Sequence, residues 1–409
     1  MSRKKLVPAA VAVAGLLLMA LLAAGCGSSG EDDSGGGSEG GSDHTIPIGM
    51  VWSLSGELAP YGQPGVDGAE MAISEINEAG GVTVGDQTYD LSLSVEDDRS
   101  DTQAAVAGAI KLIRDDQVKY LIGPLSSLTG PVAKIAAEQE AMQFNASTIA
   151  SPLAGTEDYP YLFGTVLAPE GRCEVIAESI HTFYPTVSKV AVVGPNEESG
   201  QLNFPICEEK LIEAGFDTQT FPYPAGSTDL TTTMAKVANF DPDVISTGWS
   251  VGDAFTVFPA IEPAGIPSSV PFVLYGASYE TGMEGIGGER SFVAIPFVES
   301  DFSVPSPTKA ALAFKDRLEK FLNVDKLSSE EVAAEYFYGA IHQLAASMEA
   351  ADSIDELPEI TEQMNTINTP GIAGPTEFSE NIIVAGADAT LVENGEAKTV
   401  HIVPPSAKK

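Results

Sequence analysis

Cysteine, histidine and tryptophan are scarce in this chain, and basic residues are few. Its 409 residues include three cysteines, four histidines and two tryptophans. The histidines are scattered and no pair of cysteines or histidines has a metal-binding spacing, so we expect no metal or other cofactor. Lysine and arginine total 21 against 58 aspartates and glutamates, which gives a formal net charge of −37. Because phosphate groups are bound by clustered basic residues, nucleic acid is not an expected partner.

Apolar runs long enough to span a membrane are absent beyond the N-terminus. The one long run, residues 6–22, follows three basic residues and precedes small residues and Cys26. This pattern is typical of a bacterial lipoprotein export signal, because signal peptidase accepts only small side chains at its cleavage site. We predict that residues 1–25 are the signal peptide and that Cys26 becomes the lipidated N-terminus. A retained membrane helix is the alternative, although about 17 charge-free residues lie at the lower limit for spanning.

The segment after Cys26 has no apolar residue as far as His44 and consists mostly of glycine, serine and acidic residues. Such a segment cannot bury enough surface to offset the entropy of ordering. We predict that residues 26–45 are a flexible tether with a reach of roughly 25 Å. The body that follows is expected outside the cytoplasm, attached to the cell membrane only through the lipid on Cys26.

Two cysteines remain if Cys26 carries the lipid. In an oxidising compartment, a single remaining pair favours a disulfide. We therefore predict a disulfide between Cys173 and Cys207. Two buried, unpaired thiols are the alternative that the sequence leaves open.

Extended apolar segments alternate with amphipathic segments from Thr45 onward, which is typical of βαβ units in a parallel sheet covered on both faces. The predicted strands are rich in valine and isoleucine and are bounded by glycine, proline or aspartate: residues 46–54, 91–96, 120–123, 189–193, 244–247, 271–275 and 292–297. Helices are predicted where apolar residues share one helical face: Val66, Ala69, Ile73 and Ile76, and later Val332, Tyr336, Ala340, Leu344 and Met348. Asn394-Gly395 predicts a two-residue hairpin. The fold class is α/β, and the length favours two domains.

Several short motifs follow one another in a fixed order along the body. They are Ile48-Gly49-Met50, Leu54-Ser55-Gly56, Tyr61-Gly62, Asp97-Asp98, Ile122-Gly123-Pro124, Pro131-Val132-Ala133, Gly374-Pro375-Thr376 and Val392-Glu393-Asn394-Gly395. In this order and spacing, the sequence resembles the type I periplasmic solute-binding proteins of branched-chain amino acid and amide ABC transporters. The resemblance implies two Rossmann-like lobes with parallel-rich central sheets, joined by a three-strand hinge. Lobe 1 is then expected at residues 46–165 and 298–385, and lobe 2 at residues 166–297 and 386–409.

The same resemblance implies a function. The chain is expected to be a monomer that captures a small amino acid, amide, urea or organic acid by closing its two lobes and hands it to an ABC permease. No catalysis is implied, so we predict a binding protein and not an enzyme. A ligand-sensing lipoprotein that uses the same cleft is the alternative, and the sequence leaves both open.

The ligand site is expected at the carboxyl ends of strands, where backbone N–H groups and helix N-termini face a crevice. Ser126 and Ser127 follow a predicted strand and precede a helix, so their hydroxyls are placed to donate to a carboxylate or amide oxygen. N-capping of that helix by one of them is the alternative. Ser147 and Thr148 follow the next strand and are predicted on the opposite wall. By the resemblance, Ala150 falls where a ligand-binding threonine usually lies.

Aromatic and second-lobe candidates complete the predicted site. Tyr61 and Trp249 are predicted to pack against the apolar part of the ligand, with core packing as the alternative role. By the resemblance, Ser199 falls where a tyrosine often covers the site from the second lobe. The absence of this tyrosine is one departure from the amino-acid binders of the family.

A second departure concerns the ligand's ammonium group. By the resemblance, Ala277 lies in the turn where an acidic residue often meets that group, and this turn contains no acid. A buried ammonium without a carboxylate is costly, so we expect an amide, urea, short carboxylate or aromatic acid at least as readily as leucine. Asp253 or Glu280 is the alternative source of the missing carboxylate.

An enzymatic alternative comes from Gly248-Trp249-Ser250-Val251-Gly252, a G-x-S-x-G match between a predicted strand and a predicted helix. This is the context of a hydrolase nucleophile elbow, with Ser250 as the nucleophile. A histidine must follow in such an enzyme, and only His342 and His401 do so. One lies in a predicted helix and the other near the chain end. We therefore keep Ser250 as a ligand-site candidate and a lipoprotein serine hydrolase as the second alternative.

Overall fold

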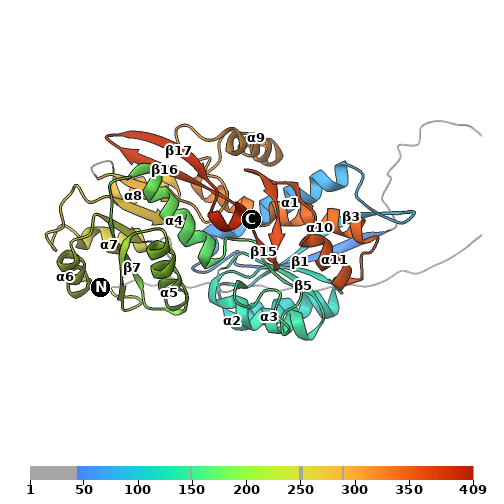
Figure 1. Cartoon of the computed structure of the whole chain (residues 1–409). Helices are drawn as coiled ribbons and strands as arrows, with labels where there is room; N and C mark the ends of the chain where they lie inside the picture. The colour runs from blue at the N-terminus through green and yellow to red at the C-terminus, as the bar shows by residue number, and fades with distance from the viewer. Residues whose placement is uncertain (1–43, 148–149, 248–251, 288–289, 409) are drawn as a thin grey trace, which may run out of the picture. The chain divides into compact units, whose positions relative to one another are not determined.

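Two sheets of mostly parallel strands, each with helices on both faces, make up the folded body (Figure 1). The computed structural model describes residues 44–147, 150–247, 252–287 and 290–408. Residues 42–409 form one compact unit. Within the described ranges, none of the helices combines the length and the apolar character that crossing a membrane requires. The α/β fold class predicted from the alternating segments is confirmed.

The first sheet has the strand order β14-β15-β6-β5-β4-β1-β3-β2. Its strands are β1 (Thr45–Trp52), β2 (Val82–Val84), β3 (Gln87–Asp97), β4 (Tyr120–Ile122), β5 (Met142–Asn145), β6 (Leu162–Gly164), β14 (Phe378–Ser379) and β15 (Ile382–Ile383). The strands from β3 across β1, β4, β5 and β6 to β15 pair in parallel, whereas β2 and β14 pair antiparallel with their neighbours. The sheet order reverses at β1, which has β3 on one side and β4 on the other.

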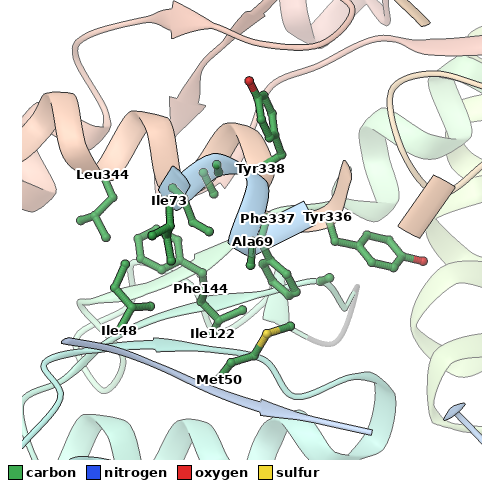
Figure 2. Packing of buried hydrophobic residues seen from close by; sticks show 14 of the residues in the cluster. Ile48, Met50, Ala69, Ile73, Ile122, Phe144, Tyr336, Phe337, Tyr338 and Leu344 are labelled. Atoms are coloured by element: carbon green, nitrogen blue, oxygen red, sulfur yellow. The ribbon is translucent and has the colours of Figure 1, made fainter. Parts of the chain in front are cut away.

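Two layers of helices cover the first sheet. They are α1 (Gly62–Glu78), α9 (Lys309–Leu322), α10 (Glu335–Ala351) and α11 (Leu357–Met364) on one face, and α2 (Thr102–Ile110) and α3 (Thr129–Glu138) on the other. Alternation along β1 explains both layers, because successive side chains of a strand point to opposite faces. Ile48 and Met50 pack with Ala69 and Leu344 of the first layer (Figure 2), and Val51 packs with the second.

The second sheet has the order β17-β16-β11-β10-β9-β7-β8. Its strands are β7 (Lys189–Pro195), β8 (Asp217–Tyr223), β9 (Val244–Thr247), β10 (Phe272–Tyr275), β11 (Phe292–Ile295), β16 (Ala387–Glu393) and β17 (Glu396–Ile402). The strands from β8 to β11 are parallel, and β16 and β17 add an antiparallel edge. Asn394 and Gly395 join these two with positive φ angles of 52° and 79°, so the predicted hairpin is confirmed.

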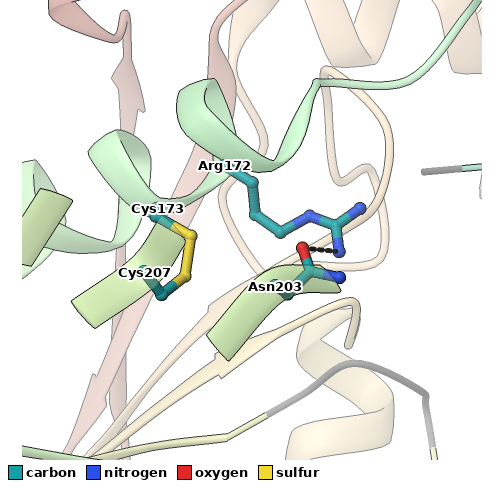
Figure 3. Close-up of a disulfide and its surroundings, with 4 residues drawn as sticks. All are labelled: Arg172, Cys173, Asn203 and Cys207. Atoms are coloured by element: carbon teal, nitrogen blue, oxygen red, sulfur yellow. Dashed lines mark hydrogen bonds between the residues drawn. A yellow bond between two sulfur atoms is a disulfide. The ribbon is translucent and has the colours of Figure 1, made fainter. Parts of the chain in front are cut away.

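The second sheet is covered in the same way as the first. Its helices are α4 (Pro169–Phe183) and α5 (Glu198–Glu213) on one face, and α6 (Thr231–Phe240), α7 (Gly252–Val257) and α8 (Tyr279–Ile286) on the other. Val190 and Val192 of β7 face the first pair, and Val193 faces the other helices. Cys173 of α4 and Cys207 of α5 are fully buried and form a disulfide with their Cα atoms 5.0 Å apart (Figure 3).

Short elements connect these layers. They are the strand pair β12 (Thr369–Pro370) and β13 (Pro375–Thr376), the 3-10 helices η1 (Ala59–Tyr61), η3 (Ser126–Leu128), η5 (Phe258–Ala260), η6 (Ser329–Ala334) and η7 (Pro405–Lys408), and the π-helical turn η2 (Lys111–Asp115). The sequence placed Val332 on the same helical face as Tyr336. Val332 instead lies in η6, because the chain forms a 3-10 helix before α10 begins at Glu335.

The chain passes between the two sheets three times. The strands of the first sheet come from residues 45–164 and 378–383, and those of the second from residues 189–295 and 387–402. The lobe boundaries that we predict at residues 165, 298 and 386 fall in the segments between these sets of strands. They remain predictions.

Candidate functional site

The strand order predicts where a ligand would bind at each sheet. In an open parallel sheet, ligands bind beyond the carboxyl ends of the strands where the order reverses. This reversal lies between β1 and β4 in the first sheet and between β7 and β9 in the second. The predicted residues Ser126 and Ser127 follow β4, and Ser199 follows β7. Trp249 and Ser250 follow β9 but lie outside the described residues.

Buried amides of β5 hold the loop that follows β4. Gln143 Nε2 donates to Gly123 O at 2.6 Å, and Asn145 Nδ2 donates to Pro124 O at 2.6 Å. Asn145 Oδ1 in turn accepts from Thr129 Oγ1 at 3.1 Å, at the start of α3. Hydrogen bonds from buried side chains fix the backbone that they contact, although Gln143 Oε1 itself has no hydrogen-bond partner among the described residues. The loop carrying the two predicted serines is therefore held at both ends by the neighbouring strand.

Ser126 and Ser127 form the 3-10 helix that leads into α3. The N-cap residue of α3 is Leu128, whose side chain makes no capping hydrogen bond. The alternative in which one of the serines is the N-cap is therefore wrong. The Ser127 side chain is exposed, whereas that of Ser126 lies outside what the structure describes. Ser127 thus lies, exposed, beyond the carboxyl end of β4.

The other first-lobe candidates lie in the segment after β5, and their surroundings differ. Ser147 is buried, directly beyond the carboxyl end of β5. Thr148 lies outside the described residues. Ala150 is fully buried and packs with Ala133 and Leu162, so its methyl group is part of the apolar interior.

Tyr61 is anchored to the end of β1 and to the core of the first sheet. Its backbone oxygen accepts from Trp52 Nε1 at 2.9 Å, and its side chain is partly buried against the first sheet's core. Burial raises the pKa of the Tyr61 phenol to about 12, and the negative charge of Glu330 adds to the effect. The phenol therefore remains protonated at neutral pH, able to donate a hydrogen bond.

The second-lobe candidates lie at the start of α5 and in the turn after β10. Ser199 lies in the first turn of α5, with its side chain outside the description. Ala277 is buried in the apolar cluster beneath α6, α7 and α8. Ser278 is the N-cap of α8, and its Oγ accepts from Thr281 N at 3.3 Å. Glu280, one of the two possible replacements for a missing acid, is exposed. Asp253, the other, has a side chain that is not described.

The histidines required by the hydrolase alternative are paired elsewhere. His342 Nε2 lies 3.3 Å from Glu75 Oε2 on α1, and His401 Nδ1 lies 3.0 Å from Asp388 Oδ1. His401 is on β17, four strands from β9 in the sheet order. At the usual spacing of about 4.8 Å between strands, this separation is about 19 Å. Neither histidine is placed beside the end of β9, which precedes Ser250.

A comparison with known families decides which kind of protein this is. The model of a family described as periplasmic binding protein matches residues 45–397. The chain belongs to the periplasmic binding protein family. The resemblance inferred from the ordered motifs is thus confirmed, and the match covers nearly the whole folded body of this periplasmic binding protein.

Individual proteins similar to this periplasmic binding protein are consistent with the family assignment. A leucine-, isoleucine-, valine-, threonine- and alanine-binding protein of Pseudomonas aeruginosa is 26% identical over 361 residues, which cover 85% of this chain and 90% of that protein. A Leu/Ile/Val-binding protein of Citrobacter freundii is 29% identical over 205 residues, covering 50% of this chain but only about half, 54%, of that protein. An ABC transporter solute-binding protein of R. palustris, solved with benzoate, has a TM-score of 0.67 at 17% identity, covering 88% of this chain and 98% of that one. This last likeness confirms the type I fold.

The sequence did not reveal Arg172, a buried cation at the carboxyl edge of the second sheet. Arg172 lies in the first turn of α4 and is only 1% exposed. Its guanidinium carbon lies 4.6 Å from the centre of the Tyr275 ring and 5.6 Å from that of Phe297. Its Nη1 donates to Asn203 Oδ1 at 3.4 Å, a long hydrogen bond (Figure 3). The one available sequence signal was an arginine on the apolar side of a helix in a chain poor in arginine.

The second feature that the sequence did not reveal is a group of four carboxylates where the chain passes between the sheets, here named the crossover carboxylates: Glu299, Asp301, Glu335 and Asp388. Glu299 is half-buried and the other three are buried. Burial raises the pKa of Glu299 to about 7 and shifts the pKa values of Asp301 and Glu335 upward as well. His401 contacts them through Asp388, with its Nδ1 3.0 Å from Asp388 Oδ1.

Backbone and hydroxyl donors satisfy most of these acids. Ser300 donates to Glu335 through both its N–H, at 3.1 Å, and its hydroxyl. Ala373 N donates to Glu299 Oε2 at 3.2 Å. Among the described residues no group of acids, histidines or cysteines has the arrangement of a metal site. These contacts hold the crossover segments in place.

Proposed function

We propose that this protein is the substrate-binding component of an ABC importer, held outside the cytoplasm by a lipid on Cys26. It captures one small molecule between its two lobes and delivers it to a permease. The observation that carries the proposal is the family match over residues 45–397 on a body of two parallel-rich sheets, each with a reversal of strand order where ligands of such sheets bind. The R. palustris neighbour is named as an ABC transporter protein, which supports the permease partner.

Ligand capture requires contacts with both lobes. A ligand shifts the balance between open and closed states only if it binds the closed state more tightly. Ser127 and Tyr61 supply hydrogen-bond donors from the first lobe, and Ser199 and Trp249 are the proposed contacts from the second. Hinge closure around the ligand is the usual motion of periplasmic binding proteins.

The ligand is proposed to carry a carboxylate. The two relatives described above are named for aliphatic amino acids and the structural neighbour was solved with benzoate, and these molecules share that group. Backbone N–H groups and hydroxyls at strand ends bind a carboxylate without a formal cation. Ser127, beyond β4, supports this proposal from the first sheet.

A thermal-shift screen tests the proposal. The fragment 42–409, one compact unit, is mixed with amino acids, amides, urea, short carboxylates and aromatic acids. A ligand at about 100 times its dissociation constant should add roughly 2.7 kcal/mol of stability and raise the melting temperature. The catalytic alternative is tested in parallel with nitrophenyl esters. Ester turnover that disappears in Ser250→Ala, with no ligand that stabilises the fragment, would contradict the binding function.

A further inference from the structure

Arg172 is a buried cation without an acidic partner. No ion pair joins it to a carboxylate within the described part of the chain. Its Nε has no hydrogen-bond partner there, and Nη1 has only the long contact with Asn203. Burying a charge is costly unless it is paired and hydrogen-bonded. The guanidinium stays charged despite burial, because arginine does not lose its proton in proteins.

A second buried arginine shows how this chain satisfies a structural cation. Arg290 is also buried, and it lies 5.8 Å from the centre of the Phe272 ring. Its Nη1 donates to two backbone oxygens, those of Pro267 at 2.8 Å and Val270 at 2.6 Å. Arg172 has aromatic neighbours like those of Arg290 but lacks such strong acceptors. The difference indicates that its acceptor comes from outside the protein.

The position of Arg172 agrees with a ligand contact. Tyr275 is the last residue of β10, Phe297 lies just beyond β11, and Asn203 belongs to α5, which follows β7. All three neighbours therefore lie at the carboxyl edge of the second sheet. Tyr336, on α10 of the first sheet's layer, lies close enough to influence the pKa of Arg172. Phe297, which faces the guanidinium, packs against the cores of both sheets, so Arg172 lies where elements of both sheets meet.

Tyr275 adds a second unused polar group. Its hydroxyl is buried and close enough to Arg172 to interact with the guanidinium, but it makes no hydrogen bond of normal geometry with the described residues. Burial raises the pKa of this phenol, although the charge of Arg172 opposes the shift, so the hydroxyl remains protonated. A protonated phenol beside a guanidinium provides two adjacent donors. Two such donors match the two oxygens of one carboxylate.

The surroundings also limit the rest of the ligand. The turn after Tyr275 contains Gly276, Ala277 and Ser278 and no acid, so it offers no partner for an ammonium group. Gly276 brings the backbone so close to Phe297 that an added Cβ would lie 2.3 Å from the ring. Two of the side chains around the guanidinium, those of Tyr275 and Phe297, are aromatic. They provide flat apolar surface against which an aromatic ring packs.

We infer that Arg172 and Tyr275 bind the carboxylate of an aromatic acid that lacks an α-ammonium group, such as benzoate or phenylacetate. This inference rests on the proposed binding function and narrows its ligand class. Arg172 is the specificity-determining residue, because it distinguishes an anion from a neutral isostere. The acid enters while the lobes are apart, and closure places its carboxylate against the buried guanidinium.

Calorimetric titration of fragment 42–409 with matched pairs tests the inference. Benzoate is compared with benzamide, and phenylacetate with phenylacetamide, because each pair differs only in the charged group. The acid should bind about 100-fold or more tightly than its amide, since an unpaired buried charge weakens a complex by this order. Arg172→Gln should remove most of that preference, and Tyr275→Phe should weaken acid binding by roughly tenfold. Arg290→Gln is the matched control and should leave the ratio unchanged.

Three outcomes would overturn the inference. Equal affinity of the wild-type fragment for acid and amide would do so without any variant, which covers the case in which Arg172→Gln does not fold. If the folded Arg172→Gln variant keeps the wild-type ratio of acid affinity to amide affinity, the arginine has a structural role. Tight binding of leucine with none of either acid would refute the aromatic class and leave the binding function standing. If no compound of the wider screen binds, the proposed function fails as well.

Discussion

Replacing Gly68 with alanine should lower the free energy of unfolding by about 3 kcal/mol or more, because two backbones touch at this position. Gly68 lies in α1, and a Cβ atom added there would lie 1.9 Å from the backbone oxygen of Ala334 in η6. A backbone oxygen cannot move aside as a flexible side chain can. The helix must therefore shift away from η6, with loss of packing around Tyr336 and Phe337, which lie just beyond η6 and pack against Trp52.

Gly130 provides a matched control for this substitution. It lies in helix α3, and an added Cβ would meet nothing within 4 Å. Gly130→Ala should be neutral or stabilise the protein by up to about 1 kcal/mol, because alanine favours the helix over glycine. Denaturant unfolding of fragment 42–409 measures both variants. Similar unfolding midpoints for Gly68→Ala and the wild type would show that α1 and η6 are not packed as closely as described.

Replacing Glu299 with glutamine should change the free energy of unfolding, relative to the wild type, more favourably at pH 8 than at pH 4.5. The expected difference between the two pH values is about 3 kcal/mol. Burial raises the pKa of Glu299 from 4.5 to about 7, with Asp388 contributing and the Ala373 N–H and His401 opposing. The folded state therefore binds this proton more tightly than the unfolded state. The resulting stability is fully present below pH 4.5 and is lost as the pH rises through 7. Glutamine carries no charge to bury and keeps an oxygen for the Ala373 N–H.

The measurement is a pair of denaturation curves at each pH from 4.5 to 8. The difference between wild type and Glu299→Gln should grow with pH and level off above 7. Glu280→Gln changes an exposed glutamate of α8 and is the matched control, which should follow the wild type throughout. A constant difference between Glu299→Gln and wild type across this range would show that Glu299 is not buried in the folded state.

Periodicity predicted the long, buried elements well because each of them buries a continuous apolar face. The predicted strand 244–247 has the observed bounds of β9, whose residues are all buried. β1 ends at Trp52, two residues earlier than predicted. Leu54 N and Ser55 N both donate to Asp97 Oδ1, so the backbone after Trp52 leaves the strand ladder for a carboxylate. A pattern of apolar residues contains no signal for such a contact between distant positions.

Other elements have too weak a hydrophobic pattern to be predicted from the sequence. β6 has only three residues, and β8 is an edge strand in which polar and apolar residues are mixed. The candidate site also contains residues that the sequence could predict and residues that it could not. Ser127 could be predicted from its place after a strand. Arg172 could not, since its burial depends on Tyr275 and Phe297, which are more than 100 residues away in sequence.

The order of the strands also governs how the chain completes its fold during synthesis. The last strands of both sheets, β14 and β15 in one and β16 and β17 in the other, come from residues 378–402. Until this segment is available, β6 and β11 are edge strands with unpaired backbone groups. Such edges are templates for pairing with other chains. A chain that stops before residue 378 would therefore leave two unpaired edge strands, one in each sheet. Both sheets are completed together, when the last segment of the chain pairs with them.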